Sequence, residues 1–399
     1  MSRPIFLFTT SFPYGHGETF LENEIPILLK KFKEVTVIPI NPFGQARTFP
    51  EGVVVLDVFK DFDYQRKLNL INLKRLITVL VLGMNRGRWL NGNLKTRTSA
   101  ILRTFSRADY FLEIIQSIEH YDSAIYYSYW LSEWALVLSI LSSDLGKNAK
   151  FVSRAHGFDL YDNREGVVNR INKSYVLKKL HGVFPVSEQG TNYLKQAYPK
   201  YNQKIVTAYL GTRNPNEKSV VIENNRFTIA SCSSLIPLKR VDLIIKTLRQ
   251  IKEEILWVHH GDGPLEEALK KEAKSLPENI EVKWMGNVDN RKIHDYYSSN
   301  RIDVFVLLSS IEGLPMSIME AHSYGIPAIC TNVGGVSEIV NETNGALLSG
   351  DYIVNDLVMI LSQMINGELV FNEKIIINNW SLNFSDRNYS QFCAKIKSL

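Results

Sequence analysis

Short apolar runs alternate with helical patterns along almost the whole chain. Each run has the length of about four to eight residues that is typical of a strand buried on both faces. Strands that alternate with helices predict βαβ units, which form parallel sheets covered by helices. The predicted strands are residues 5–9, 35–40, 53–56, 123–127, 151–154 and 182–186 in the first half, and 226–231, 255–259, 280–284, 304–308 and 328–330 in the second.

The length of the chain indicates more than one domain. At 399 residues it exceeds what one hydrophobic core usually organises. Polar residues 213–219 and 223–226 separate the halves and are typical of a linker. We therefore predict an α/β protein of two doubly wound, Rossmann-like domains facing a central cleft, with residues 1–210 in the first and 211–378 in the second. Residues 379–399 are predicted as a C-terminal helix, for which a return to the first domain is one arrangement.

Composition excludes several classes of protein. The three cysteines are few, odd in number and far apart, which argues against a disulfide scaffold or a zinc site and favours a reducing cytoplasm. The longest apolar run after the N-terminus, residues 76–84, is about half of what a spanning helix needs. Residues 1–10 have too short an apolar core for a secretory signal. We therefore expect a cytoplasmic protein without a membrane-spanning segment.

Positive charge is concentrated in residues 60–107. This segment holds eleven Lys or Arg against two Asp, a net charge of +9, whereas the whole chain carries +5. Basic and apolar residues interleave there, and such a pattern can bind an anionic membrane surface, at about 1 kcal/mol for each basic residue. We predict an anionic inner membrane face as a partner; surface helices with a solvated basic face are the alternative. No nucleic-acid partner is expected, since no recognition motif accompanies the charge.

Two carboxylates, Glu312 and Glu320, lie on either side of a predicted helix start. Glu312 follows the apolar run 304–308, and Glu320 falls about one and a half turns inside the helix that Pro315 begins. The free N–H groups between them and the helix dipole form an anion site. Hydroxyls on both sides of a phosphate would suit such a site, as in a nucleotide-sugar. The residues predicted to form it are Gly313, Leu314, Pro315, Met316 and Ser317.

The sequence around these carboxylates resembles a known enzyme family. Residues 309–327, 332–338 and 344–347 are similar, almost position by position, to the E-x7-E region of retaining glycosyltransferases of family 4, of the bacterial polysaccharide-assembly type, which have the GT-B fold. The resemblance covers most of residues 180–350 and the first half more loosely.

The resemblance implies roles for the two carboxylates. Glu320 would hydrogen-bond the ribose of the nucleotide, and Glu312 would lie beside the donor sugar. No side chain of this sequence can be named as a covalent nucleophile. The resemblance implies a front-face reaction in which the leaving phosphate acts as the base.

The diphosphate of the donor also needs cations, because negative charge builds on the leaving nucleotide. The family supplies an Arg and a Lys in a pattern like G-R-L-x-P-x-K-G, and residues 233–240 correspond to it. Lys239 falls on the Lys position, but Ser234 replaces the Arg, and Arg240 stands where Gly is common. Arg240 either compensates for Ser234 or is a surface residue.

Two further features complete the predicted donor site. Gly261 and Gly263 fit the family's G-x-G-P turn and do not form a dinucleotide fingerprint, which needs a third glycine. No D-x-D stands at a strand end near the predicted cleft. We therefore expect metal-independent transfer with no cofactor and no metal site.

Candidate residues in the first half follow the predicted strands. The stretch 154–159 resembles the family's H-G-x-D loop, whose His contacts the donor sugar, so His156 is a candidate catalytic residue beside Glu312. Asp159 either fixes this loop or caps a helix. Tyr129 and Trp130 either stack on a sugar or pack in the core. Glycines in the first loop allow close approach of a ligand, and the predicted acceptor-binding residues are Gly15, His16, Gly17 and Glu18.

These features predict an enzyme that moves a sugar from a UDP- or GDP-sugar to a hydroxyl acceptor with retention of anomeric configuration. The resemblance and the basic segment favour a lipid-linked glycan as acceptor, in polysaccharide, O-antigen or capsule synthesis. A nucleotide-sugar epimerase of the same fold is one alternative. A catalytically silent nucleotide-sugar-binding protein is another, because Ser234 replaces the usual Arg.

Overall fold

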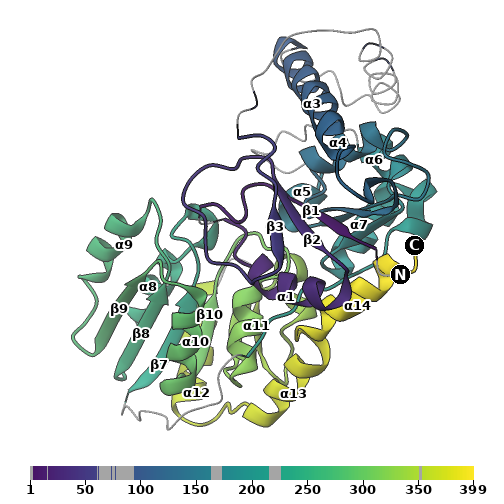
Figure 1. The fold of residues 1–399 in the computed structure, drawn as a ribbon. Helices are drawn as coiled ribbons and strands as arrows, with labels where there is room; N and C mark the ends of the chain where they lie inside the picture. The colour runs from purple at the N-terminus through teal and green to yellow at the C-terminus, as the bar shows by residue number, and fades with distance from the viewer. Residues whose placement is uncertain are drawn as a thin grey trace. The chain divides into compact units, whose positions relative to one another are not determined.

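A computed structural model describes residues 3–15, 17–60, 62, 73, 77, 94–162, 173–214, 226–349 and 353–399. The chain divides into two compact units (Figure 1). The N-terminal unit comprises Met1–Tyr209 and Tyr389–Leu399, and the C-terminal unit comprises Leu210–Asn388. Each unit is built on its own parallel sheet.

The sheet of the N-terminal unit has the strand order β3-β2-β1-β4-β5-β6 within the described residues, and every pairing in it is parallel. The strands β1 and β2 are buried along their full length, as their apolar runs predict. The strands are β1 (Ile5–Thr9), β2 (Val35–Pro39), β3 (Val53–Val55), β4 (Ile125–Ser128), β5 (Lys150–Ala155) and β6 (Gly182–Pro185). The helices are α1 (Leu21–Lys31), α3 (Leu94–Ile115), α4 (Glu133–Leu141), α5 (Gly157–Leu160), α6 (Lys173–Lys179), α7 (Glu188–Ala197) and α14 (Arg387–Lys397).

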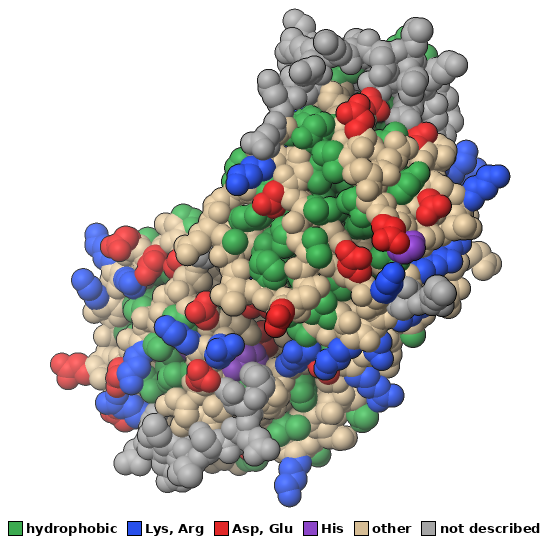
Figure 2. Space-filling model, viewed as in Figure 1, with side chains coloured by type: hydrophobic (Ala, Val, Ile, Leu, Met, Phe, Trp, Pro, Cys, Tyr) green, Lys and Arg blue, Asp and Glu red, His purple; other side chains and the backbone are tan. Residues whose placement is uncertain are grey.

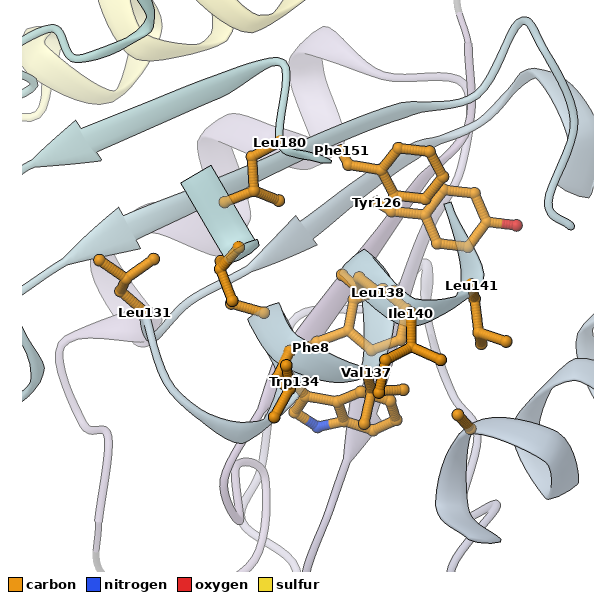
Figure 3. Packing of buried hydrophobic residues seen from close by; sticks show 14 of the residues in the cluster. Phe8, Tyr126, Leu131, Trp134, Val137, Leu138, Ile140, Leu141, Phe151 and Leu180 are labelled. Atoms are coloured by element: carbon orange, nitrogen blue, oxygen red, sulfur yellow. The ribbon is translucent and has the colours of Figure 1, made fainter. Parts of the chain in front are cut away.

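Helices cover both faces of this sheet. On one face, α3, α4 and α6 bury a core in which Trp134 of α4 lies 4.5 Å, between ring centroids, from Phe8 of β1 (Figure 3). On the other face, Arg154 of β5 forms a fully buried ion pair of 3.3 Å with Glu24 of α1. The Arg154 guanidinium lies 4.0 Å from the ring centroid of Phe392, so a cation–π contact holds α14 on the N-terminal unit.

The sheet of the C-terminal unit has the order β12-β11-β10-β7-β8-β9 within the described residues, again with parallel pairings throughout. One face packs on α8, α9 and α12, whereas His260 at the end of β8 contacts α10 on the other face. The strands are β7 (Phe227–Cys232), β8 (Ile255–His260), β9 (Ile280–Gly286), β10 (Val304–Leu307), β11 (Ala328–Thr331) and β12 (Gly345–Leu348). The helices are α8 (Asp242–Leu248), α9 (Glu266–Ala273), α10 (Asn290–Ser299), α11 (Met316–Ser323), α12 (Ile353–Ile365) and α13 (Glu373–Asn383).

The predicted fold class, an α/β protein with two doubly wound parallel sheets, is confirmed. The cleft between the halves stays a prediction. Strand order reverses between β1 and β4 in one sheet and between β7 and β10 in the other. Ligands of doubly wound sheets bind outside the carboxyl ends of strands at such points, so the loops after these strands are where a site is expected.

The surface features predicted from charge are only partly covered by the described residues. Figure 2 shows Lys and Arg side chains interspersed with Asp and Glu on the visible face of the C-terminal unit, as is usual for a solvated surface. Most of the basic segment 60–107 lies outside the described residues, and Arg107 within it pairs with Glu133. Across the described ranges, no helix combines the length and the apolar character needed to cross a membrane.

Candidate functional site

Backbone hydrogen bonds join the loops at the carboxyl edge of the C-terminal sheet into one structure, here called the carboxyl rim (residues 233–240, 261–264, 308–317 and 332–335). Ser233 N donates to His260 O at 3.0 Å and Leu235 N to Asp262 O at 2.7 Å. Ser310 N donates to Leu238 O at 2.8 Å, and Gly335 N donates to Gly313 O at 2.8 Å. The loops after β7, β8, β10 and β11 are therefore fixed relative to one another.

Gly261 and Gly263 allow two loops of the carboxyl rim to approach closely. Both have a positive φ, 131° and 156°. A Cβ atom on Gly261 would lie 2.0 Å from Ser233 O, and one on Gly263 would lie 2.7 Å from Leu235 O. The glycines are therefore required by the fold of the rim, and their contact with a donor stays a prediction.

Glu320 is buried in the C-terminal unit. The helix α11 begins at Met316, directly after Pro315, and places Glu320 on the face that packs toward α10. Its side chain accepts a hydrogen bond of 2.9 Å from Asn290 Nδ2 at the start of α10, and the residue is only 7% exposed. Burial raises the pKa of Glu320 to about 7, although the Asn290 hydrogen bond partly offsets this. Nothing in the local sequence around Asn290 predicts this contact.

The structure brings Glu312 and Lys239 together. Lys239 Nζ lies 2.5 Å from Glu312 Oε1, and the two side chains are 24% and 10% exposed. A cation from the loop after β7 thus meets a carboxylate from the loop after β10, at the point where the strand order reverses.

Arg240 binds the backbone of the carboxyl rim. Its Nε donates to Leu308 O at 2.7 Å and its Nη2 to Ser309 O at 3.1 Å, so the guanidinium holds the end of β10. Its φ is 47°, a left-handed conformation that favours glycine. Glycine, which the family pattern has at the position of Arg240, would adopt this backbone conformation without strain. A phosphate contact from Arg240 stays a prediction.

His156 lies at the carboxyl edge of the N-terminal sheet, directly after β5. Its ring centroid is 4.7 Å from that of Tyr129 and 4.5 Å from that of Trp130. Neither ring nitrogen has a hydrogen-bond partner among the described residues. Burial, and then the nearby charge of Arg154, hold the pKa of His156 well below its usual value, so the imidazole is neutral at physiological pH.

Asp159 fixes the loop that carries His156. Its Oδ1 accepts from His156 N and its Oδ2 from Leu131 N, both at 2.7 Å. The carboxyl therefore ties the loop after β5 to the loop after β4. Burial raises the pKa of Asp159 to about 7.

The first loop of the N-terminal unit is organised by Glu18. The Glu18 carboxylate accepts hydrogen bonds from three backbone N–H groups, of residues 10, 11 and 12, at 2.8–2.9 Å. Trp130 Nε1 donates to it as well, at 2.6 Å. Gly15 has a φ of 65°. The Arg47 side chain donates to the carbonyl oxygens of Gly15 and Gly17. His16 lies outside the described residues.

Comparison with known proteins identifies the domain that carries the two carboxylates. Residues 212–379 match the family model of glycosyl transferases group 1. The match covers less than half of the chain. The predicted resemblance of this segment to a glycosyltransferase family is confirmed.

Sequence relatives align with only part of this chain. An O-antigen biosynthesis glycosyltransferase, WbnH of Escherichia coli, is 36% identical over 110 residues, which are 28% of this chain and 30% of the relative. A lipopolysaccharide 1,6-galactosyltransferase of Escherichia coli is 32% identical over 143 residues, which are 34% of this chain and 39% of the relative. The matches therefore span about a third of the length of these relatives.

Solved structures match the fold of the whole chain. A lipopolysaccharide outer core galactosyltransferase, WaaB in its apo form, is 18% identical with a TM-score of 0.70, over 99% of both chains. HepE of Anabaena, in complex with UDP and glucose, is 17% identical with a TM-score of 0.70, over 100% of both. These similarities confirm the predicted GT-B fold.

Proposed function

We propose that this protein is a retaining glycosyltransferase that moves a sugar from a UDP- or GDP-sugar to a hydroxyl acceptor. The observation that carries the proposal is the arrangement of Glu312 and Glu320 around the start of α11, inside a glycosyl transferases group 1 domain. Lys239 beside Glu312 supplies the positive charge that a diphosphate requires. The structure of HepE in complex with UDP-glucose supports a donor of this class.

Glu320 is the proposed ribose ligand. Its carboxyl is buried and has one side-chain hydrogen bond in the described structure, from Asn290 to Oε1. A ribose offers two neighbouring hydroxyls as donors, which the ionised carboxylate can accept. These hydroxyls would compensate the burial that holds the pKa of Glu320 at about 7.

Lys239 and the first N–H groups of α11 are the proposed diphosphate ligands. Since Lys239 is paired with Glu312, a bound diphosphate would compete with Glu312 for the ammonium group. The exchange would free the Glu312 carboxylate to orient the donor sugar and to stabilise positive charge at its anomeric carbon. Arg240 would contribute indirectly, because its guanidinium binds the carbonyls of residues 308 and 309, just before the loop that carries Glu312.

The proposed reaction breaks the bond between the anomeric carbon and the phosphate oxygen. The acceptor oxygen forms its bond to the same face of that carbon, and its proton passes to the leaving phosphate. His156, as a neutral imidazole, would hydrogen-bond the donor sugar. Among the described residues, no group of three or more His, Cys, Asp or Glu is placed to hold a metal ion. Metal independence is part of the proposal, with Lys239 and α11 carrying the charge.

A lipid-linked glycan in O-antigen or related polysaccharide synthesis is the proposed acceptor, because relatives of the group 1 domain carry such names. Peripheral binding to an anionic membrane through residues 60–107 belongs to the same proposal. Sedimentation with anionic liposomes at low and high salt tests it. Absence of pelleting at low salt would contradict membrane binding.

Product analysis tests the proposed activity. Radiolabelled UDP- and GDP-sugars are incubated with and without acceptor glycan, and the anomeric configuration of the product is read by NMR. We expect a product with the donor's configuration, formed only with acceptor, apart from slow donor hydrolysis. An epimerised nucleotide-sugar without acceptor would identify an epimerase. Binding of the donor without any turnover would identify a catalytically silent protein.

A further inference from the structure

An aromatic group lies at the carboxyl edge of the N-terminal sheet, where the strand order reverses. Trp130 follows β4, His156 follows β5 and Phe158 lies in α5. The Trp130 ring centroid is 4.5 Å from His156 and 6.5 Å from Phe158. Phe158 is 58% exposed and Trp130 is partly exposed, whereas Tyr129 is fully buried. The structure thus separates two residues that the sequence leaves equivalent: Tyr129 belongs to the core, and Trp130 reaches the surface.

The indole of Trp130 is held by Glu18. One oxygen of the carboxylate, Oε1, accepts from Trp130 Nε1 and from the backbone N–H of residue 10. The other, Oε2, accepts from the N–H groups of residues 11 and 12. A carboxylate has about four lone-pair sites, so these donors occupy them. An acceptor hydroxyl could bind Glu18 only by displacing a donor of this chain.

We propose that Trp130 is a stacking surface for a pyranose ring of the acceptor glycan and that Glu18 is the residue that positions it. The inference rests on the proposed function and deepens it. Pyranose rings present a face of C–H groups that packs on an indole, and a ring fixed in advance loses little conformational entropy on binding. The His156 ring, whose nitrogens are buried, packs against the Trp130 ring and supports it.

Saturation-transfer NMR on the full chain with UDP tests the proposal. The probes are the methyl glycosides of glucose, galactose, mannose and N-acetylglucosamine. We expect ring protons of at least one probe to receive saturation. Trp130→Ala should reduce the effect at least about fivefold, whereas Trp130→Phe should keep about half of it. Phe43→Ala, which removes another exposed aromatic ring of this unit, is the matched control and should leave the effect unchanged.

A double-mutant cycle tests the role of Glu18. Glu18→Ala should reduce saturation about twofold in the wild-type background and should have no further effect when Trp130 is already Phe, because both changes remove the hydrogen bond between Glu18 and Trp130. Circular dichroism checks that each variant is folded. Saturation that survives Trp130→Ala, no probe that receives saturation, or additive effects of the two changes would overturn the proposal. Failure of the proposed function would appear separately, as absence of UDP and GDP binding.

Discussion

Replacing Glu312 with Gln is expected to tighten nucleotide binding while it removes sugar transfer. The Lys239 ammonium lies 2.5 Å from the Glu312 carboxylate, and both side chains are largely buried. A nucleoside diphosphate must compete with that carboxylate. The amide of Gln has no charge with which to compete, so Lys239 becomes available at a lower cost.

The size of the effect follows from the ion pair. A charge-assisted hydrogen bond between partly buried groups contributes about 1–2 kcal/mol net, more than an exposed pair. Its removal should therefore lower the Kd for UDP or GDP about five- to thirtyfold. Transfer should fall about 100-fold or more, because the carboxylate that stabilises charge at the anomeric carbon is lost.

Titration calorimetry with UDP and with GDP measures the change in affinity. Asp262→Asn is the matched control, since Asp262 is exposed on the same carboxyl rim and its replacement also removes one negative charge. We expect the control to change Kd less than about twofold, because exposed charges are screened by salt. Weaker or unchanged binding by Glu312→Gln, or an equal effect of Asp262→Asn, would refute the competition.

Three further predictions concern the titration of the site and the stability of the two units. Burial raises the pKa of Glu320 to about 7, and ribose hydroxyls bind the ionised carboxylate, so UDP binding should tighten as pH rises from about 6 to 8. Calorimetry should show no such pH dependence for Glu320→Gln. A wild-type affinity for UDP that does not change with pH would contradict the assignment. Gly261→Ala should destabilise the C-terminal unit by about 2–4 kcal/mol, because its Cβ would lie 2.0 Å from Ser233 O. The control is Gly367→Ala, because Gly367 also has a positive φ but has open space around it, and this change should cost about 1 kcal/mol. Thermal unfolding measures both variants. Equal losses of stability would argue against the close approach of Gly261 to Ser233. Arg154→Met leaves Glu24 buried without its cation and should cost the N-terminal unit about 3–5 kcal/mol in urea unfolding. The double variant with Glu24→Gln should lose less, and an equal or larger loss would speak against the ion pair.

Local sequence patterns predicted the features that depend on neighbouring residues. Uniform apolar runs predicted the buried strands, and Pro315 predicted the start of α11 to within one residue, since the helix begins at Met316. The strand β12 was not predicted, because Gly345–Leu348 begins with glycine and has no β-branched residue to indicate a strand.

Contacts between distant elements could not be predicted in this way. The sequence did not indicate that the Glu18 carboxylate accepts from backbone N–H groups and from Trp130, which is more than a hundred residues away; its predicted contact with an acceptor stays a prediction. Asn290 meets Glu320 only because α10 and α11 pack on the same face of the sheet. The left-handed backbone of Arg240 likewise depends on the loop around it, although the usual glycine at that position was a signal.

The central claim is that the carboxylates around α11 bind a nucleotide-sugar for transfer. Glu320→Ala, assayed beside the wild type with radiolabelled nucleotide-sugars and an acceptor glycan, tests it most directly. We predict that labelled product falls at least about 100-fold, because the buried ribose ligand is lost while the helix start and Lys239 remain. Undiminished transfer by a folded Glu320→Ala protein would contradict the account.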